Sequence, residues 1–342
     1  MKNLDFPYYL TDYLGKYLPG QKNLSKHTIS AYSTTFKLLF IFCEEIKGIK
    51  TDKLSFAVIN HDLIIDYLNW LEYSRGCSIS TRNQRLVALH SFFRYVQKKT
   101  PENLFEFQKI LNIPNKKAPK KILPYLSGEE MKILLNQPKS STIEGYRDKV
   151  LLIVLYDTAA RVQELIDLKV KDIRLSHPAV ITVTGKGNKT RQIPIMEKTR
   201  KHLEEYISKL KYNFGMPKGE QFLFINQRKC QLTRWGVSYI INKYVNLAKT
   251  DSKFKCNFSI TPHVFRHSKS MHMLQSGVNL IYIRDFLGHS DCSTTEIYAR
   301  ADTEMKRKAI EAAYNDILPP IEAPSWNEDA DLMAFLSSLS VT

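Results

Sequence analysis

The stretch "NIPNKKAPKKILPYLS", residues 112 to 127, divides the sequence into two parts. It holds three prolines and four lysines, and it follows neither the helical nor the strand period. Proline lacks a backbone N–H and fixes φ, so such a stretch is typical of an extended linker. The 342 residues are enough for a hydrophobic core on each side. The sequence therefore predicts a domain over residues 1–114, a basic linker over 115–126, a second domain over 127–318 and a tail over 319–342.

Basic residues outnumber acidic residues in the chain as a whole. There are 50 Lys and Arg against 34 Asp and Glu, which gives a formal net charge of +16 at pH 7. This balance favours a polyanionic partner, and nucleic acid is the first class to consider. The tail is the exception, because residues 319–342 hold four acidic residues and no lysine or arginine. We expect the tail to have a different role from the basic body.

The five cysteines are scattered, and no two form a Cys-x-x-Cys pair. Neither a disulfide framework nor a thiolate zinc site is therefore expected, and a reducing cytoplasm fits this usage. The longest apolar stretch, "VLLIVLY", is far too short to span a membrane. We expect a cytoplasmic protein with no membrane partner.

Two runs before the linker have the spacing of helices that bury one face. The run "LSKHTISAYSTTFKLLFIFCEEI" has its start signal at Ser25, since serine is a preferred N-cap residue. In the run "SISTRNQRLVALHSFFRYVQKK", the polar and basic residues Thr81, Arg82 and Arg85 gather at the beginning. The first domain is therefore predicted to be all-helical, with a basic helix start.

The second domain opens with Ser127 and Glu130, which form a capping box. The run "GYRDKVLLIVLYDTAARVQELIDLKVKDI" then predicts helix, turn and helix, with Arg161 close to the second helix and Glu164 three residues later. An Arg–Glu pair at this spacing is by itself usually a surface ion pair. The run "AVITVTGKGNKTRQIPI" predicts a β-hairpin with Lys186 at its tip, and its spacing does not fit a nucleotide-binding P-loop.

The run "SITPHVFRHSKSMHMLQSG" predicts a helix that begins at Pro262 after the N-cap Thr261 and stops at Gly277. His263 and Arg266 share the face of its first turn. Three histidines lie in this run, but no fourth ligand accompanies them, so no metal site is expected. A helix start with an arginine and a histidine instead favours a phosphate.

The motifs "TAARVQEL", "TGKGNKTRQIPI", "HVFRH" and "LGHSDCSTTEIYARAD", in this order, resemble those of the tyrosine recombinases of the phage integrase family. The similarity is greatest to compact Xer-like and transposon-encoded members, and it spans nearly the whole chain. It implies a mainly α fold with a small antiparallel β-sheet, in which a helical, SAM-like core-binding domain precedes a catalytic domain. One departure is Ala159-Ala160, where Thr-Gly-Leu is commoner before the first arginine.

The resemblance also implies the site residues, which are Arg161, Lys186, His263, Arg266, His289 and Tyr298, with Glu164 in support. Two guanidiniums can stabilise the charge that develops on an attacked phosphodiester, since each forms forked hydrogen bonds to its oxygens. Tyr298 is expected to attack, His263 to take its proton, His289 to hold the phosphate and Lys186 to protonate the departing 5′-oxygen. The product is a 3′-phosphotyrosyl ester, and neither metal nor other cofactor is expected.

The chain is accordingly expected to be a site-specific recombinase that integrates and excises a mobile element. A chromosome-dimer-resolving Xer-type recombinase, a type IB topoisomerase and a non-catalytic DNA-binding regulator are the alternatives. The expected partners are double-stranded DNA with paired half-sites and further copies of the chain, forming a tetramer in the synapse at the nucleoid. DNA contacts are predicted for Thr81, Arg82, Arg85, Lys116, Lys117, Lys120, Lys121 and Arg234.

The tail ends in "NEDADLMAFLSSLSVT", in which Leu332, Phe335, Leu336 and Leu339 have helical spacing on one side. A helix this short is not stable alone in water, so it must dock on a protein surface. Docking on its own catalytic domain and docking on a neighbouring copy both fit the sequence.

Overall fold

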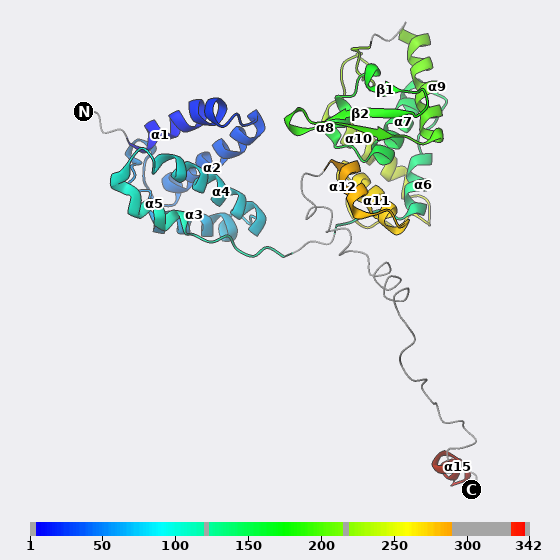
Figure 1. Cartoon of the computed structure of the whole chain (residues 1–342). Coiled ribbons are helices and arrows are strands. Elements are labelled where there is room, and N and C mark those ends of the chain that lie inside the picture. Colours follow the sequence, from blue (N-terminus) through cyan, green and yellow to red (C-terminus); the bar gives the residue numbers. More distant parts are fainter. Residues whose placement is uncertain (1–4, 120–122, 215–218, 289–329, 339–342) are drawn as a thin grey trace. The chain divides into compact units, whose positions relative to one another are not determined.

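The chain forms two compact units, Met1–Lys121 and Ile122–Thr342, in a computed structural model (Figure 1). The structure describes residues 5–119, 123–214, 219–288 and 330–338. His289 and Tyr298 lie outside these residues. Of the helices that it describes, none is long and apolar enough to cross a membrane.

Unit 1 is built only of helices in the part that the structure describes. Its hydrophobic core is rich in aromatic rings, and the ring of Phe92 lies edge-on to Phe6, Tyr13 and Phe36 at centroid distances of 5.2 to 5.4 Å. The two predicted helices are confirmed as α2 and α4. Ser25 caps the first by accepting a hydrogen bond from the Thr28 N–H, and Ser78 caps the second in the same way. The elements are α1 (Phe6–Asp12), η1 (Tyr13–Gln21), α2 (Lys26–Glu45), η2 (Thr51–Lys53), α3 (His61–Asn69), η3 (Trp70–Ser74), α4 (Ile79–Val96), η4 (Pro101–Asn103) and α5 (Leu104–Leu111).

Unit 2 combines helices with one small sheet. The helices are α6 (Gly128–Asn136), α7 (Ile143–Thr158), α8 (Val162–Ile166), α9 (Glu197–Phe214), α10 (Arg234–Ala248), α11 (Pro262–Gln275), α12 (Leu280–Leu287) and α15 (Ala330–Ser338). Short 3-10 turns are η5 (Val170–Asp172) and η6 (Lys186–Asn188), and the strands are β1 (Ile173–Arg174), β2 (Val180–Thr184) and β3 (Thr190–Pro194). The predicted capping box at the start of α6 is confirmed.

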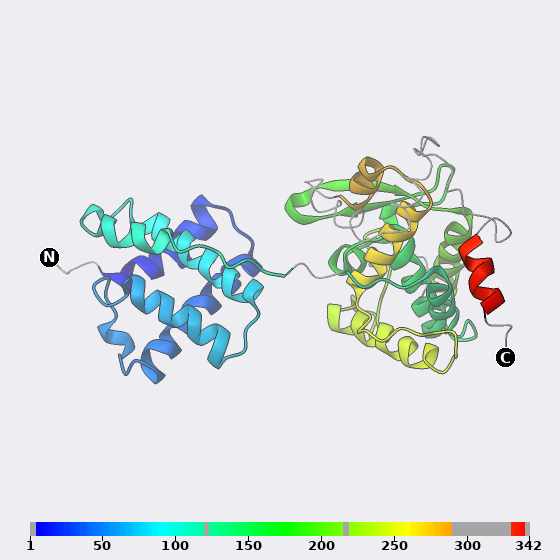
Figure 2. The same cartoon turned by 90° about the horizontal axis from the view of Figure 1, so that it is seen from below.

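The three strands form an antiparallel sheet in the order β1-β2-β3. Ile181 and Ile193 face each other across β2 and β3, and both are buried in the core of unit 2. The predicted β-hairpin is therefore confirmed, and it projects from the body of the unit (Figures 1 and 2). Behind the sheet, α7 packs against α9 and α11. The mainly α fold with a small antiparallel sheet is the one that the sequence predicts.

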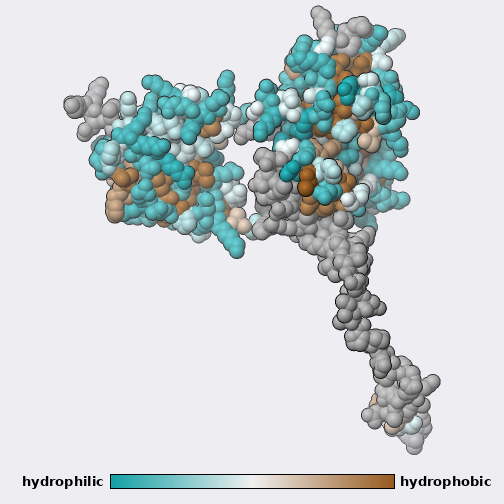
Figure 3. All heavy atoms as spheres, viewed as in Figure 1, coloured by the Kyte–Doolittle hydropathy of each residue, from teal (hydrophilic) through white to brown (hydrophobic). Residues whose placement is uncertain are grey.

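Hydrophilic side chains cover most of the visible surface of each unit, and an apolar patch lies over α12 (Figure 3). The exposed Ile281 belongs to this helix. In α15, Phe335 of the predicted apolar stripe is 59% exposed. The helix of the tail thus forms as predicted and presents an apolar side chain at its surface.

Both ends of the predicted linker are held by hydrogen bonds to its backbone. The Asn83 side chain accepts from the Lys116 N–H at 3.1 Å and donates to the Lys116 carbonyl at 2.7 Å. In unit 2, the Leu126 N–H donates to Ser268 Oγ at 2.8 Å, and the Leu126 carbonyl lies 2.9 Å from His272 Nε2. The segment between these two anchored ends, residues 117–125, is therefore shorter than the predicted linker.

Two glycines occupy matching positions near the starts of α7 and α10, but a substitution to alanine is expected to affect stability in different ways at the two positions. Each donates its N–H to the threonine that caps its helix, Gly145 to Thr142 and Gly236 to Thr233. A Cβ at Gly145 would lie 2.1 Å from the Lys139 carbonyl oxygen, whereas a Cβ at Gly236 would meet nothing closer than 3.4 Å. Gly145→Ala should therefore lower the free energy of unfolding by about 1–3 kcal/mol through steric strain.

Gly236→Ala is the control, and we expect it to leave stability unchanged or raise it by up to about 1 kcal/mol, since alanine favours helix. Urea unfolding of the two variants and the parent chain measures the difference. Equal effects of the two substitutions would show that the Lys139 turn does not constrain α7.

Candidate active site

The turn between α7 and α8 presents Arg161. Helix α7 ends at Thr158, and the next residue, Ala159, has the left-handed conformation with φ of 48°. Arg161 then caps α8, and its N–H and Nη1 both donate to the Glu164 carboxylate, at 2.9 and 2.8 Å. The Arg161 side chain is 40% exposed and the Glu164 side chain only 3%. The Arg–Glu pair is therefore not a simple surface ion pair, because its carboxylate is buried and only its guanidinium is partly exposed.

Alanine replaces the commoner glycine in this turn, and the turn nevertheless forms. A left-handed conformation costs a non-glycine residue about 1–2 kcal/mol. Ala159 is fully buried, and its carbonyl accepts a hydrogen bond of 2.7 Å from Arg266 Nη1. That bond and the packing of the methyl group offset the conformational cost.

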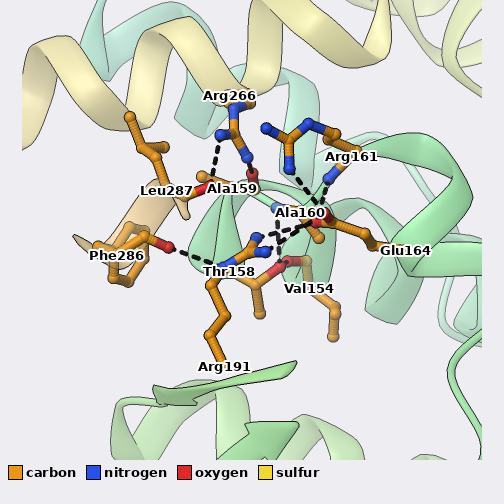
Figure 4. Close-up of polar contacts among 10 residues, drawn as sticks. All are labelled: Val154, Thr158, Ala159, Ala160, Arg161, Glu164, Arg191, Arg266, Phe286 and Leu287. Atoms are coloured by element: carbon orange, nitrogen blue, oxygen red, sulfur yellow. Dashed lines mark hydrogen bonds and ion pairs between the residues drawn. The ribbon is translucent and has the colours of Figure 1, made fainter. Parts of the chain in front are cut away.

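Arg266 comes from the first turns of α11 and is 4% exposed. It donates from Nη1 to Ala159 and from Nη2 to the Leu287 carbonyl, the latter at 2.6 Å (Figure 4). One bond reaches two residues before Arg161 and the other two residues before His289. Arg266 therefore joins segments that the sequence analysis assigned to one site.

His263 lies on the same helix turn and reaches the surface of the unit. Burial lowers its pKa, and the charges of Arg266 and Arg161 lower it further. The imidazole is consequently neutral at neutral pH and can accept a proton. The His267 ring lies 6.4 Å away in a stacked arrangement, and burial, together with His263 and Arg266, lowers its pKa to about 4.

The third histidine of the run, His272, has both ring nitrogens in hydrogen bonds within unit 2. His272 Nδ1 accepts from the Tyr156 hydroxyl at 2.8 Å, and Nε2 donates to the Leu126 carbonyl. Among the residues that the structure describes, no three His, Cys, Asp or Glu side chains come together as a metal site needs.

Lys186 begins the turn η6 at the tip of the hairpin. The residue before it, Gly185, lies against the Arg161–Glu164 pair, since a Cβ there would be 3.0 Å from Glu164 Oε1 and 4.0 Å from Arg161 Nη1. The absence of a side chain at Gly185 lets the hairpin backbone approach this closely. The attachment point of Lys186 is therefore next to Arg161.

Arg191 is a site residue that the sequence analysis missed. It lies on β3, where Thr190 and Gln192 are exposed and Ile193 is buried. It donates from Nη1 and Nη2 to the Glu164 carboxylate, at 3.2 and 2.8 Å (Figure 4). The alternation of the strand is the signal that could have found it, because an arginine on the inward face requires an internal partner.

The predicted DNA contacts in unit 1 have intramolecular partners. Arg82 is 4% exposed, with Nε 3.7 Å from Glu72, and Arg85 donates to the Ala31 carbonyl at 3.0 Å. Thr81 packs at the start of α4, where its N–H donates to Ser78. Because Arg82 is buried in an ion pair, we do not carry it into the proposed DNA interface.

The remaining residues predicted to contact DNA differ in their exposure and in whether they already have a protein partner. Lys116 Nζ donates to Glu72 at 2.7 Å, and this bond raises the lysine pKa. Lys117 is exposed, while Lys120 and Lys121 lie outside the described residues. Arg234 is exposed at the first position of α10, where it donates to Gln163 at 2.7 Å.

Together, the described groups provide two arginines and a neutral histidine around one turn of the chain. Guanidiniums stay charged at any physiological pH and match the geometry of phosphate oxygens. A neutral imidazole beside them can take a proton from an attacking hydroxyl. The arrangement is suited to nucleophilic attack on a phosphodiester.

Comparison with known proteins also points to a protein that cuts and rejoins DNA. Residues 124–305 match the model of the phage integrase family, and residues 11–99 match the N-terminal SAM-like domain of phage integrases. The protein y4rC of Sinorhizobium fredii, which carries the name integrase/recombinase, is 34% identical over 325 residues, or 94% of this chain and 95% of y4rC. Tyrosine recombinase XerD of Staphylococcus haemolyticus is 30% identical over 91% of this chain and 98% of its own length.

Two solved structures have the same fold. The XerH recombinase, in a post-cleavage complex with its palindromic difH substrate, aligns with a TM-score of 0.66 at 22% identity, over 85% of this chain and 80% of XerH. The Tn1549 transposon integrase, in complex with transposon right end DNA, aligns with a TM-score of 0.67 at 17% identity, over 87% of this chain and 97% of the integrase chain. The chain belongs to the phage integrase family and is a site-specific tyrosine recombinase.

Proposed function

We propose that this recombinase integrates and excises a mobile DNA element, with Tyr298 as the nucleophile. The observation that carries the site assignment is the turn at Ala159–Arg161, which binds the buried Arg266 on one side and Glu164 on the other. The mobile-element task is supported by similarity to the integrase/recombinase y4rC and by the fold shared with a transposon integrase. The protein acts on DNA in the cytoplasm, at the nucleoid.

In the proposed reaction, the Tyr298 hydroxyl oxygen attacks the phosphorus and His263 takes the hydroxyl proton. The bond from phosphorus to the 5′-oxygen breaks, and Lys186 gives that oxygen a proton. Arg161, Arg266 and His289 stabilise the charge that develops on the phosphate. The 3′-phosphotyrosyl ester keeps the energy of the broken bond, so a 5′-hydroxyl of another strand can reverse the reaction without ATP.

Resolution of chromosome dimers is the second candidate, because Xer recombinases at 30% and 33% identity are among the relatives. The position of the recombination site separates the two tasks. Sites at both ends of a DNA segment that carries this coding region support the mobile element. One chromosomal site, recombined between two chromosome copies, supports dimer resolution.

The first prediction concerns the nucleophile. Tyr298→Phe should bind its DNA site as tightly as the parent chain and form no covalent adduct, because only the attacking oxygen is removed. A nicked suicide substrate, analysed on denaturing gels, measures the adduct. An undiminished adduct in the variant would show that another residue attacks, and no adduct in the parent chain would favour a non-catalytic regulator.

The second prediction concerns the linker lysines. Lys117, Lys120 and Lys121 are proposed to lie along DNA phosphates, so changing all three to Gln should weaken binding to specific and random duplexes alike. The slope of log affinity against log salt should flatten by up to about 0.9 per lost contact. Lys116→Gln is the matched control, and we expect a smaller effect because Lys116 is paired with Glu72. A loss restricted to the specific site would mean that these lysines read bases.

We further propose that the protein assembles as a tetramer on paired half-sites and that the tail links neighbouring copies. Helix α15 presents Phe335 at its surface, and a short helix gains stability by docking such a side chain. The prolines Pro319, Pro320 and Pro324 precede it and favour an extended connection. An acidic tail is suited to a basic protein surface and unsuited to DNA.

Truncation after Pro320 tests this link. The shortened chain should bind a single half-site normally, fill the two-half-site DNA with less cooperativity and recombine more slowly. Gel-shift titration on one and two half-sites measures the difference. Unchanged cooperativity would mean that the tail packs on its own catalytic domain.

A further inference from the structure

The Arg191 guanidinium lies inside unit 2 although it belongs to an edge strand. Its backbone pairs with Val183, which is fully buried, and its side chain is 14% exposed. An arginine in this position is tolerated only where acceptors surround its charge.

All three nitrogens of the Arg191 guanidinium donate to the interior (Figure 4). Nη1 and Nη2 donate to the two oxygens of Glu164, and Nε donates to the Phe286 carbonyl at 3.0 Å. Glu164 is 27 residues away in sequence and Phe286 is 95 residues away. One side chain therefore fastens the hairpin to two remote segments.

Glu164 is the first of these segments, and it lies between two guanidiniums. Burial alone would raise its pKa, but hydrogen bonds from Arg191 and from the Arg161 N–H and side chain lower it. The carboxylate therefore stays ionised and keeps holding Arg161. Among the described side chains, Arg161 and Arg191 are the charged groups that face it, and the turn after β2 approaches it with Gly185.

The end of α12 is the second segment. The Gly288 N–H contacts the carbonyls of Arg284 and Asp285, which leaves those of Phe286 and Leu287 to be satisfied. Arg191 takes the Phe286 carbonyl and Arg266 takes the Leu287 carbonyl. Gly288, with φ of +64°, packs on the Arg191 guanidinium, where a Cβ would lie 3.0 Å from Nη1. The next residue is His289.

We propose that Arg191 is a positioning residue of the cleavage site. It sets Arg161 through Glu164, and it sets the attachment point of His289 through the end of α12. This inference rests on the proposed function for its link to catalysis, and it assigns Arg191 no contact with DNA.

Arg191→Gln tests the proposal. At saturating DNA, adduct formation on the suicide substrate should fall about 10- to 100-fold, because misplacing a reacting group by about 1 Å has effects of this size. Affinity for a half-site should stay within about twofold, since Arg191 is not a DNA contact. Arg174→Gln is the matched control: it removes an exposed arginine from the same sheet, one that donates to the Pro178 carbonyl. It should leave both quantities unchanged.

The pH dependence distinguishes positioning from a general loss of structure. Without Arg191, the Glu164 pKa is higher than in the parent chain, because burial still raises it and the hydrogen bonds from Arg191 no longer lower it. A fall in pH therefore protonates more of the carboxylate in the variant and weakens its hold on Arg161. The ratio of variant to parent rates should therefore fall further as the pH falls, and taking the ratio cancels the titration of His263. The double variant Arg191→Gln with Glu164→Gln should lack this dependence, and Arg191→Lys should also lack it because the charge is kept.

A measurement without DNA separates this proposal from the role of Tyr298. Hydrogen exchange of the Arg161 amide and of the amides at the end of α12 should speed up in Arg191→Gln and not in Arg174→Gln. Unchanged exchange would overturn the proposal whatever residue attacks. A parent-like cleavage rate, weaker DNA binding with a parent-like saturated rate, or a rate ratio independent of pH would overturn it as well.

Discussion

The rest of the candidate site depends on the buried guanidinium of Arg266, because its hydrogen bonds hold two other segments of the site in place. A cation that is removed from water needs acceptors on the protein, and Arg266 finds two of them in backbone carbonyls. One belongs to Ala159, which holds a left-handed conformation to end α7, and the other belongs to Leu287 at the end of α12. Those two points fix where Arg161 begins its helix and where the chain continues toward His289.

Charge around this group is distributed so that each member keeps one protonation state. Two arginines hold the Glu164 carboxylate ionised despite its burial. Two arginine charges and burial hold His263 neutral. A permanently positive field beside a neutral base is what attack by a weakly acidic hydroxyl requires. Arg161 completes the field from a partly exposed position, while its anchor Glu164 is shielded from solvent and therefore only weakly screened by salt.

The parts of the structure that depend on local signals were predictable from the sequence. Ser25 and the Ser127–Glu130 pair cap their helices as expected, because a cap is decided within four residues. The burial of Arg82 was also readable and was overlooked, since Leu86 and Leu89 follow it at helical spacing on the buried face of α4. The role of Arg191 could not be read in full. Strand alternation points its side chain inward, but its partner at Phe286 is 95 residues away, and only the folded chain brings them together.

The sharing of the last α12 carbonyls between Arg191 and Arg266 has a consequence for biosynthesis. A ribosome delivers Arg161, Glu164 and Arg191 well before it delivers Phe286 and Leu287, and long-range contacts cannot form until both partners exist. Until then, Arg191 and Arg266 each lack one of the carbonyl acceptors that they have in the folded unit. Arg191 and Arg266 therefore reach the arrangement described here only after residue 287 has been made.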